Sequence, residues 1–345
     1  MGIELNALHW VYLVFILAII GFLLMRRDTS FICILGIFSL GLVATSSISQ
    51  SIMGVFNSFI YAIQELSGTI LIISIITAMS NVLMKTGINE AMVYPFTKLI
   101  RTPALAYWVI GILMMVISWF FWPSPAVALL GAVLLPVAVR VGLPAMGVAV
   151  AMNLFGHGIA LSGDYIIQGA PKLTADGAGI PVADVVSASV PLVIIMGVVT
   201  TVAAFFYLFR DIKNKKIAVH RADEDSSALS KTSDEKESSY FPKRFTKIFA
   251  VLIPLLYLVD IVIMFTEKLQ GGDATALIGG TTVFILILIS FYAYKSGGLE
   301  KITDHLIEGL QFGFRIFGPV IPIAAFFYLG DAALPQIYGD VLPAA

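Results

Sequence analysis

The chain has 345 residues, of which 59% are hydrophobic and 12% charged, and its formal net charge is −1. Soluble domains are about half apolar and a quarter charged, so most of this chain cannot be solvated by water. The small net charge gives no general attraction to nucleic acid. The single cysteine, Cys33, cannot build a disulfide framework or a cysteine metal site.

Apolar stretches recur along the whole chain, and the first begins close to the N-terminus without a basic leader, which indicates a retained span rather than a signal peptide. An apolar helix of about 20 residues crosses a bilayer core of about 30 Å. The sequence therefore predicts an all-α fold, a polytopic transmembrane helical bundle of about ten spans. They lie near 7–25, 31–49, 69–84, 104–122, 125–140, 144–162, 187–209, 246–266, 275–294 and 314–330.

Lysine and arginine fall mainly in alternate connections between these stretches, which the positive-inside rule places in the cytoplasm. Only Lys172 and Lys268 fall in the other set of connections. The N-terminus of this multi-pass cell-membrane protein is then expected outside. Residues 210–245 are polar and poor in apolar side chains, so they are expected to form a cytoplasmic linker between two membrane halves.

The two halves share a pattern that predicts an inverted repeat. An amphipathic segment at Ser51–Ser67 precedes one span, and a similar segment at Ile302–Phe314 precedes another, as expected of helices lying in the membrane interface. The predicted domains are a first repeat at 1–209, the linker at 210–245 and an incomplete second repeat at 246–345. About 110 residues of the second copy are absent, so the chain is expected to be truncated or its repeat partial. The alternative is a hydropathy rhythm shared by chance.

The stretch from Trp119 to Pro125 contains two prolines, which break helices and free backbone carbonyl groups. A break at membrane depth favours a cavity, as in broken or re-entrant helices. The alternative is an interfacial aromatic belt in which Pro123 only ends a span. The apolar runs within 125–162 fit either two full spans or a re-entrant hairpin with Arg140 at its tip.

Polar residues and glycines then interrupt the stretch 151–165. Asn153, His157 and Asp164 would lie along one face of a continuous helix, where polar side chains must meet protein or water. His157 and Asp164 could relay protons, or Asp164 could help to bind sodium. The alternative is a packed glycine-rich helix with a hydrogen-bonded His157. Residues 168–181 are too polar to span, so they form an outer loop or a lid.

Enzyme chemistry is not expected, because the sequence has neither a His-Glu-x-x-His zinc motif nor a Gly-x-Ser-x-Gly nucleophile motif. A phosphate-binding Gly-x-x-x-x-Gly-Lys-Ser/Thr loop is also missing from the sequence, which disfavours a nucleotide-driven pump. We expect no catalytic residues, metal or cofactor. The expected partners are a small-molecule or ion substrate and the lipid bilayer, and small-residue faces permit a homodimer without requiring one.

In Trp119–Pro125, Asn153–Gly158 and Ser162–Pro171 the chain resembles bacterial permeases of the ion transporter superfamily, which includes gluconate, citrate and C4-dicarboxylate symporters. The resemblance implies inverted repeats, each with a hairpin and an unwound helix, that together bind an organic anion with H⁺ or Na⁺. It implies a hairpin or break at Ser124 and Pro125. The unwound helix would carry Asn153, Gly156, His157, Gly158 and Ser162, to which the residue analysis adds Asp164 as a binding residue.

The expected function is secondary active transport of a small solute, such as a carboxylate or sugar acid, coupled to H⁺ or Na⁺. One alternative is a Na⁺/H⁺ antiporter of the same superfamily. Another is a non-transporting membrane fragment, because this chain lacks a second hairpin and a second broken helix.

Overall fold

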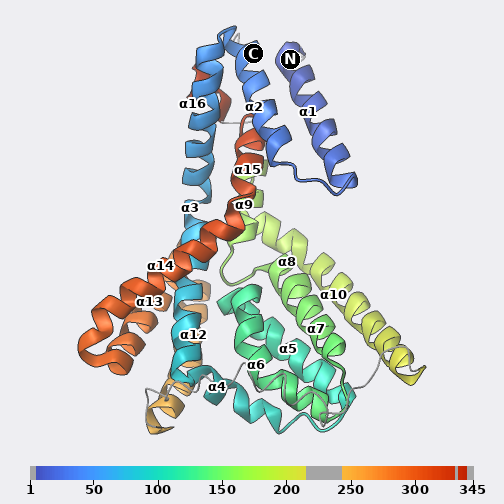
Figure 1. The fold of residues 1–345 in the computed structure, drawn as a ribbon, viewed down its shortest axis with the longest axis vertical. Coiled ribbons are helices and arrows are strands. Elements are labelled where there is room, and N and C mark those ends of the chain that lie inside the picture. Colours follow the sequence, from blue (N-terminus) through green and yellow to red (C-terminus); the bar gives the residue numbers. More distant parts are fainter. Residues whose placement is uncertain (1–4, 215–242, 331–332, 340–345) are drawn as a thin grey trace. The chain divides into compact units, whose positions relative to one another are not determined.

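The computed structural model describes residues 5–214, 243–330 and 333–339, and within them every regular element is a helix (Figure 1). Most of the predicted linker at 210–245 lies outside the described residues. The prediction of an all-α polytopic membrane protein is confirmed. Seven of the described helices are long and apolar enough to cross a membrane, and α14 with α15 would add an eighth.

The chain forms two compact units, each with its own core. The first unit holds residues 1–70 and 312–345. Its helices are α1 (Ala7–Leu24), α2 (Ser30–Thr45), the first part of α3 (Ile48–Thr86), the end of α14 (Gly298–Phe317), α15 (Val320–Tyr328) and α16 (Ala333–Tyr338).

In the first unit, α2 packs against both α1 and α15. Phe326 of α15 is fully buried and its ring stacks on Tyr12 of α1 at 4.9 Å. Gly36 of α2 makes this packing close, because an added Cβ would lie 2.7 Å from the Phe326 ring. The core of this unit therefore joins helices from the two ends of the chain.

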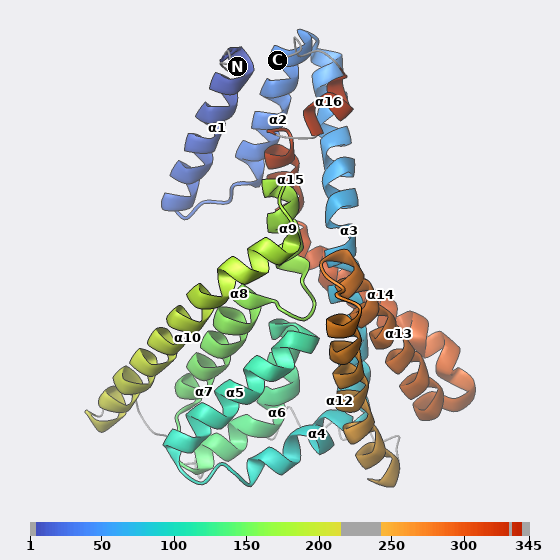
Figure 2. The same cartoon turned by 180° about the vertical axis from the view of Figure 1, so that it is seen from behind.

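The second unit holds residues 71–311. It contains the rest of α3 and most of α14, together with α4 (Ile88–Thr97), α5 (Pro103–Phe121), α6 (Pro123–Arg140), α7 (Ala145–Met152), the wide helix η1 (Asn153–Ala160), α8 (Leu161–Gly163), α9 (Gly169–Ala178), α10 (Val182–Lys213), α12 (Lys243–Thr266), α13 (Gly272–Tyr294) and the short 3₁₀ turn η3 (Lys295–Gly297). Helices α5, α6 and α7 lie side by side in both views (Figures 1 and 2).

Local sequence explains where α5 begins. Pro103 occupies the first helical position, where its missing N–H costs no hydrogen bond. The side chain of Thr102 caps the helix, since its hydroxyl oxygen accepts a hydrogen bond from the Leu105 N–H at 3.2 Å. The following apolar run continues to Phe121 and meets α6, α7 and η1.

The predicted interfacial helix at Ser51–Ser67 is wrong as a separate element, because α3 runs without a break from Ile48 to Thr86. Some of the hydroxyl side chains of α3 bond to the preceding turn of the helix, whereas those of Ser58 and Ser80 are buried without a partner within the described residues. The hydroxyls of Ser67 and Thr77 donate to carbonyls three and four residues earlier, at 2.7 and 2.8 Å. The two predicted repeat segments therefore differ, since α14 ends at Phe317 before α15 begins.

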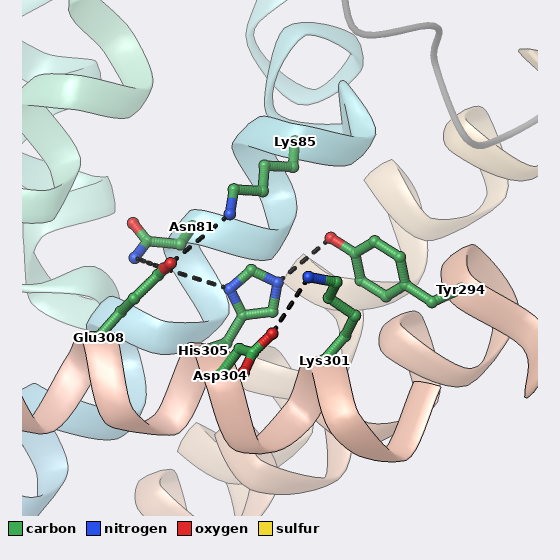
Figure 3. A network of polar contacts seen from close by, with 7 residues as sticks. All are labelled: Asn81, Lys85, Tyr294, Lys301, Asp304, His305 and Glu308. Carbon is green, nitrogen blue, oxygen red and sulfur yellow. Dashed lines mark hydrogen bonds and ion pairs between the residues drawn. The ribbon is translucent and has the colours of Figure 1, made fainter. Parts of the chain in front are cut away.

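A polar network fastens α14 to α3 within the second unit (Figure 3). His305 is fully buried, and its ring nitrogens lie 3.2 Å from the Tyr294 hydroxyl and 3.4 Å from a Glu308 oxygen. Glu308 in turn accepts a hydrogen bond from Asn81 at 3.1 Å and pairs with Lys85 at 3.7 Å. The network links one buried imidazole to a half-exposed ion pair.

Candidate functional site

The polar and glycine-rich stretch predicted as a binding region lies in η1, a helix wider than an α-helix. The Leu161 N–H donates to the carbonyl of Gly156, five residues earlier, which is the π-helical pattern. Such wide turns are rare and are frequent at functional sites. The expected unwound helix is therefore wrong in form, because the backbone stays helical from Ala145 to Gly163.

Two neighbouring helices hold η1 through glycines. A Cβ added to Gly111 of α5 would lie 2.5 Å from the Phe155 ring, and one added to Gly156 would lie 2.6 Å from Met114. On α10, a Cβ on Gly197 would lie 3.0 Å from Ile159. The position of η1 thus depends on close backbone approach from both sides.

Three buried polar atoms of α5 and η1 have no hydrogen-bond partner within the described residues. They are Ser118 Oγ, Trp119 Nε1 and His157 Nδ1. The Ser118 side chain is adjacent to η1, because its oxygen lies 3.2 Å from the Cβ position of Gly156. Unpaired buried polar groups destabilise a fold, so their presence here favours a ligand or water that completes the bonds. Ser118 was not among the residues predicted from the sequence.

The structure shows only part of the polar helix face that the sequence predicted for Asn153, His157 and Asp164. Asn153, Gly158 and Ser162 are exposed and His157 is half-buried, but Asp164 lies beyond the helix end at a left-handed φ of 39°. The expectation that Asp164 extends this face is wrong, because the wide helix and the turn at its end re-aim the chain. An exposed asparagine and serine on a spanning helix still require a polar environment.

Asp164 caps α9 instead of facing an open site. Its side chain is 3% exposed, and its Oδ2 accepts a hydrogen bond from the Ala170 N–H at 2.9 Å. The Gln168 N–H donates to the backbone carbonyl of Asp164 at 3.0 Å, and the N–H groups at the start of α9 further favour the ionised carboxyl. Burial nevertheless outweighs these bonds and raises the pKa of Asp164, one residue past the end of the span, to about 7. A role for Asp164 in binding stays a prediction.

The break predicted at Trp119–Pro125 is a reversal between two helices. Helix α5 ends at Phe121 and α6 begins at Pro123, with only Trp122 between them at a φ of 57°. That positive φ is uncommon for a bulky residue and stores backbone strain. Ser124 and Pro125 lie in the first turn of α6, half-buried and buried. Of the readings expected here, a helix that ends at Pro123 and a hairpin at Ser124 and Pro125 agree with this structure, whereas a single helix broken at this point does not.

The segment predicted as an outer loop or lid contains α9 and is tied to the start of α13. The Gly271 N–H donates to the side-chain oxygen of Gln168 at 2.7 Å, and the Thr275 hydroxyl donates to the Ile167 carbonyl at 2.6 Å. These bonds fix the turn after Asp164. Within the described residues, no three His, Cys, Asp or Glu side chains come together as a metal-binding group.

Comparison with known proteins identifies the family. The model of the C4-dicarboxylate anaerobic carrier family, DcuC, matches residues 11–312. This chain belongs to that family. It is also 56% identical over 343 residues to the uncharacterised membrane protein YhfA of Bacillus subtilis (strain 168), a match that covers 99% of this chain and 73% of the relative. No solved structure matches the chain.

Membership of a carrier family confirms that the chain is a membrane protein of a transporter class, and a carrier is not an enzyme. The broader ion transporter superfamily, the truncation and the repeats at 1–209 and 246–345 stay predictions. The matched range includes every predicted binding residue, from Ser124 to Asp164. The roles of those residues also stay predictions.

Proposed function

We propose that this chain carries C4-dicarboxylates across the cell membrane together with H⁺ or Na⁺. The observation that supports it most directly is the family match over residues 11–312, within which η1 and its unpartnered polar atoms lie. The N-terminus is outside and the linker at 210–245 cytoplasmic in this proposal. The earlier prediction of a broader organic anion is thereby narrowed to one substrate class.

The substrate lies along the polar side of η1. Asn153 of η1 and Ser162 of the following α8 are exposed neutral donors, and His157 of η1 adds an imidazole whose Nδ1 has no partner among the described residues. Between Pro103 and Gly163 the sequence contains only one lysine or arginine, Arg140. A dianion bound chiefly by neutral donors leaves its charge uncompensated in a medium of low dielectric constant. Co-transported cations supply that compensation, which favours symport.

A groove of about 390 Å³ in the first unit does not suit this substrate. It is lined only by apolar side chains, among them Phe31, Leu35, Ile52 and Phe56. Burying two carboxylates against hydrocarbon without hydrogen bonds is strongly unfavourable. The proposed dicarboxylate site is therefore in the second unit, where η1 lies.

The test is uptake of radiolabelled succinate by proteoliposomes that contain the purified chain. Exchange of internal for external succinate is expected, with competition by fumarate and malate and little by gluconate. Preference for gluconate would assign the carrier to sugar acids instead. Na⁺/H⁺ exchange without any effect of succinate would contradict the proposal and favour the antiporter.

A further inference from the structure

A buried carboxyl group lies in the second unit, on a spanning helix, and the proposed dicarboxylate site does not use it. Asp260 belongs to α12, one of the candidate spans, and is 4% exposed. It lies on the packed face of the helix with Ile253 and Tyr257, whereas Leu258 and Val262 are about half exposed. Asp260 therefore faces protein and not lipid.

Only one of the two oxygens of the Asp260 carboxyl has a hydrogen-bond partner within the described residues. Its Oδ1 accepts a hydrogen bond from the Thr281 hydroxyl of α13 at 3.0 Å. Its Oδ2 is buried and has no partner within the described residues. The neighbouring Tyr257 hydroxyl is already engaged, with Thr282 at 2.9 Å and with the sulfur of Met79 at 3.6 Å.

No charged side chain of the described residues forms an ion pair with Asp260. The charged residues on the helices beside α12 point elsewhere: Glu90 of α4 and Asp273 of α13 are exposed, and Lys85 of α3 pairs with Glu308. Tyr257, three residues earlier on α12, is the titratable group on the same face. The contacts of Tyr257 on α3, α5 and α13 are to uncharged Met79, Phe120, Phe121 and Thr282.

A buried carboxyl with one unpaired oxygen is suited to bind a small cation. Ionised carboxylates inside a membrane are rare, and they pair with other groups or mark ion pathways. The free Oδ2 can hold a proton, or it can ligate Na⁺ together with the Thr281 oxygen, since hard cations prefer oxygen ligands. The charges of a dicarboxylate would repel an ionised Asp260, so a cation and not the substrate suits this position.

We propose that Asp260, supported by Thr281, binds the cation whose gradient drives the carrier. The coupling role of Asp260 rests on the proposed function, whereas cation binding at Asp260 does not. Coupling requires that cation and substrate change each other's affinity by the same factor. A carrier without the cation site would bind succinate more weakly, so it would still exchange succinate for succinate at saturating concentration, but it could not accumulate succinate.

The experiment compares the purified chain with three variants in proteoliposomes: Asp260→Asn, Asp260→Glu, and Asp273→Asn as an exposed carboxylate control. Succinate exchange is measured without gradients. Accumulation is then measured in two arms, an inward proton gradient without Na⁺ and an inward Na⁺ gradient at equal pH. Asp260→Asn should keep exchange and lose accumulation in the arm that drives the unmodified chain. Asp273→Asn should keep both.

The active arm identifies the cation as H⁺ or Na⁺. Accumulation by Asp260→Asn equal to that of the unmodified chain in both arms would overturn the proposal. If Asp260→Asn fails to fold, Asp260→Glu and Thr281→Val decide. Gradient-driven accumulation that is kept in Asp260→Glu and weakened in Thr281→Val would support the cation site. Full gradient-driven accumulation in Thr281→Val would contradict it.

Cation binding is also measured without succinate, so that the two proposals fail separately. The readouts are the infrared band of a protonated carboxyl and the retention of radioactive Na⁺ by detergent-purified protein. Because Asp164 also contributes to the protonated-carboxyl band, one of these signals should be smaller in Asp260→Asn than in the unmodified chain, even if the chain exchanges no succinate. Equal signals in both proteins would overturn the Asp260 site whatever the transport result.

Discussion

The region of η1 and α9 and the region of α12 and α13 each bury one carboxyl almost completely, yet they satisfy it differently. Asp164 is 3% exposed and bonds to backbone N–H groups at the start of α9. Asp260 is 4% exposed and receives one hydroxyl donor. The difference indicates that Asp164 has a structural partner built into the fold, whereas Asp260 retains an oxygen for a ligand. Burial alone does not separate the two roles.

The largest expected effect is on the pH dependence of stability. The pKa of Asp164 is raised from an ordinary value of 3.8 to about 7, so its contribution to stability is present below about pH 4 and is lost as the pH rises through 7. A shift of that size corresponds to about 4 kcal/mol. Asp164→Asn should therefore reduce the fall in the unfolding free energy between pH 4 and 8, measured in detergent, by about that amount.

The matched control is Asp176→Asn, which changes a carboxylate on α9 that pairs with Lys172 and is 38% exposed. It should leave the pH dependence as it is. An unchanged pH profile in Asp164→Asn would show that its carboxyl is ionised throughout this range and would favour the predicted role of Asp164 in binding.

The next largest expected effect is on stability, and it compares a glycine packed against η1 with a glycine on α13. Gly111→Ala places a methyl group 2.5 Å from the Phe155 ring, which cannot retreat easily, and should destabilise the chain by roughly 1–3 kcal/mol and lower succinate exchange. Gly279→Ala on α13 meets only the end of Ile72 at 3.1 Å and should change stability by less than about 0.5 kcal/mol. Thermal unfolding and exchange of both variants check this. Equal effects would mean that η1 is not held by close packing.

Hydropathy predicts most of the helices, although the expected span at 314–330 is divided between α14 and α15, and it does not predict their contacts. The polar character of Asn153, His157 and Ser162 marked the candidate region because such residues are rare in spans. The π-helical form of η1 was not predictable, because it depends on the fit of Phe155 against Gly111 of another helix. The importance of Asp260 depends on Thr281, 21 residues later, and no local pattern joins them.

His157→Ala tests the η1 region alone. Loss of the imidazole should raise the KM for succinate by roughly tenfold, which is about 1.4 kcal/mol, and remove the pH dependence of exchange. Gradient-driven accumulation should persist at saturating succinate, because Asp260 is unchanged. Membrane insertion, checked by detergent extraction of monodisperse protein, should also be unaffected. Retention of both KM and pH dependence would remove His157 from the site.

The smallest expected effect lies outside both regions, in the network around His305. Glu308 and Lys85 are each more than two-fifths exposed, so their ion pair contributes at most about 1 kcal/mol. Glu308→Gln should lower the unfolding temperature slightly, and a double-mutant cycle with Lys85→Gln measures the pair directly. Exchange and accumulation should both remain normal, since neither residue contacts η1 or Asp260 in the described structure. Loss of gradient-driven accumulation in Glu308→Gln would transfer the coupling role from Asp260 to the contact between α3 and α14, because that network also contains a buried titratable group.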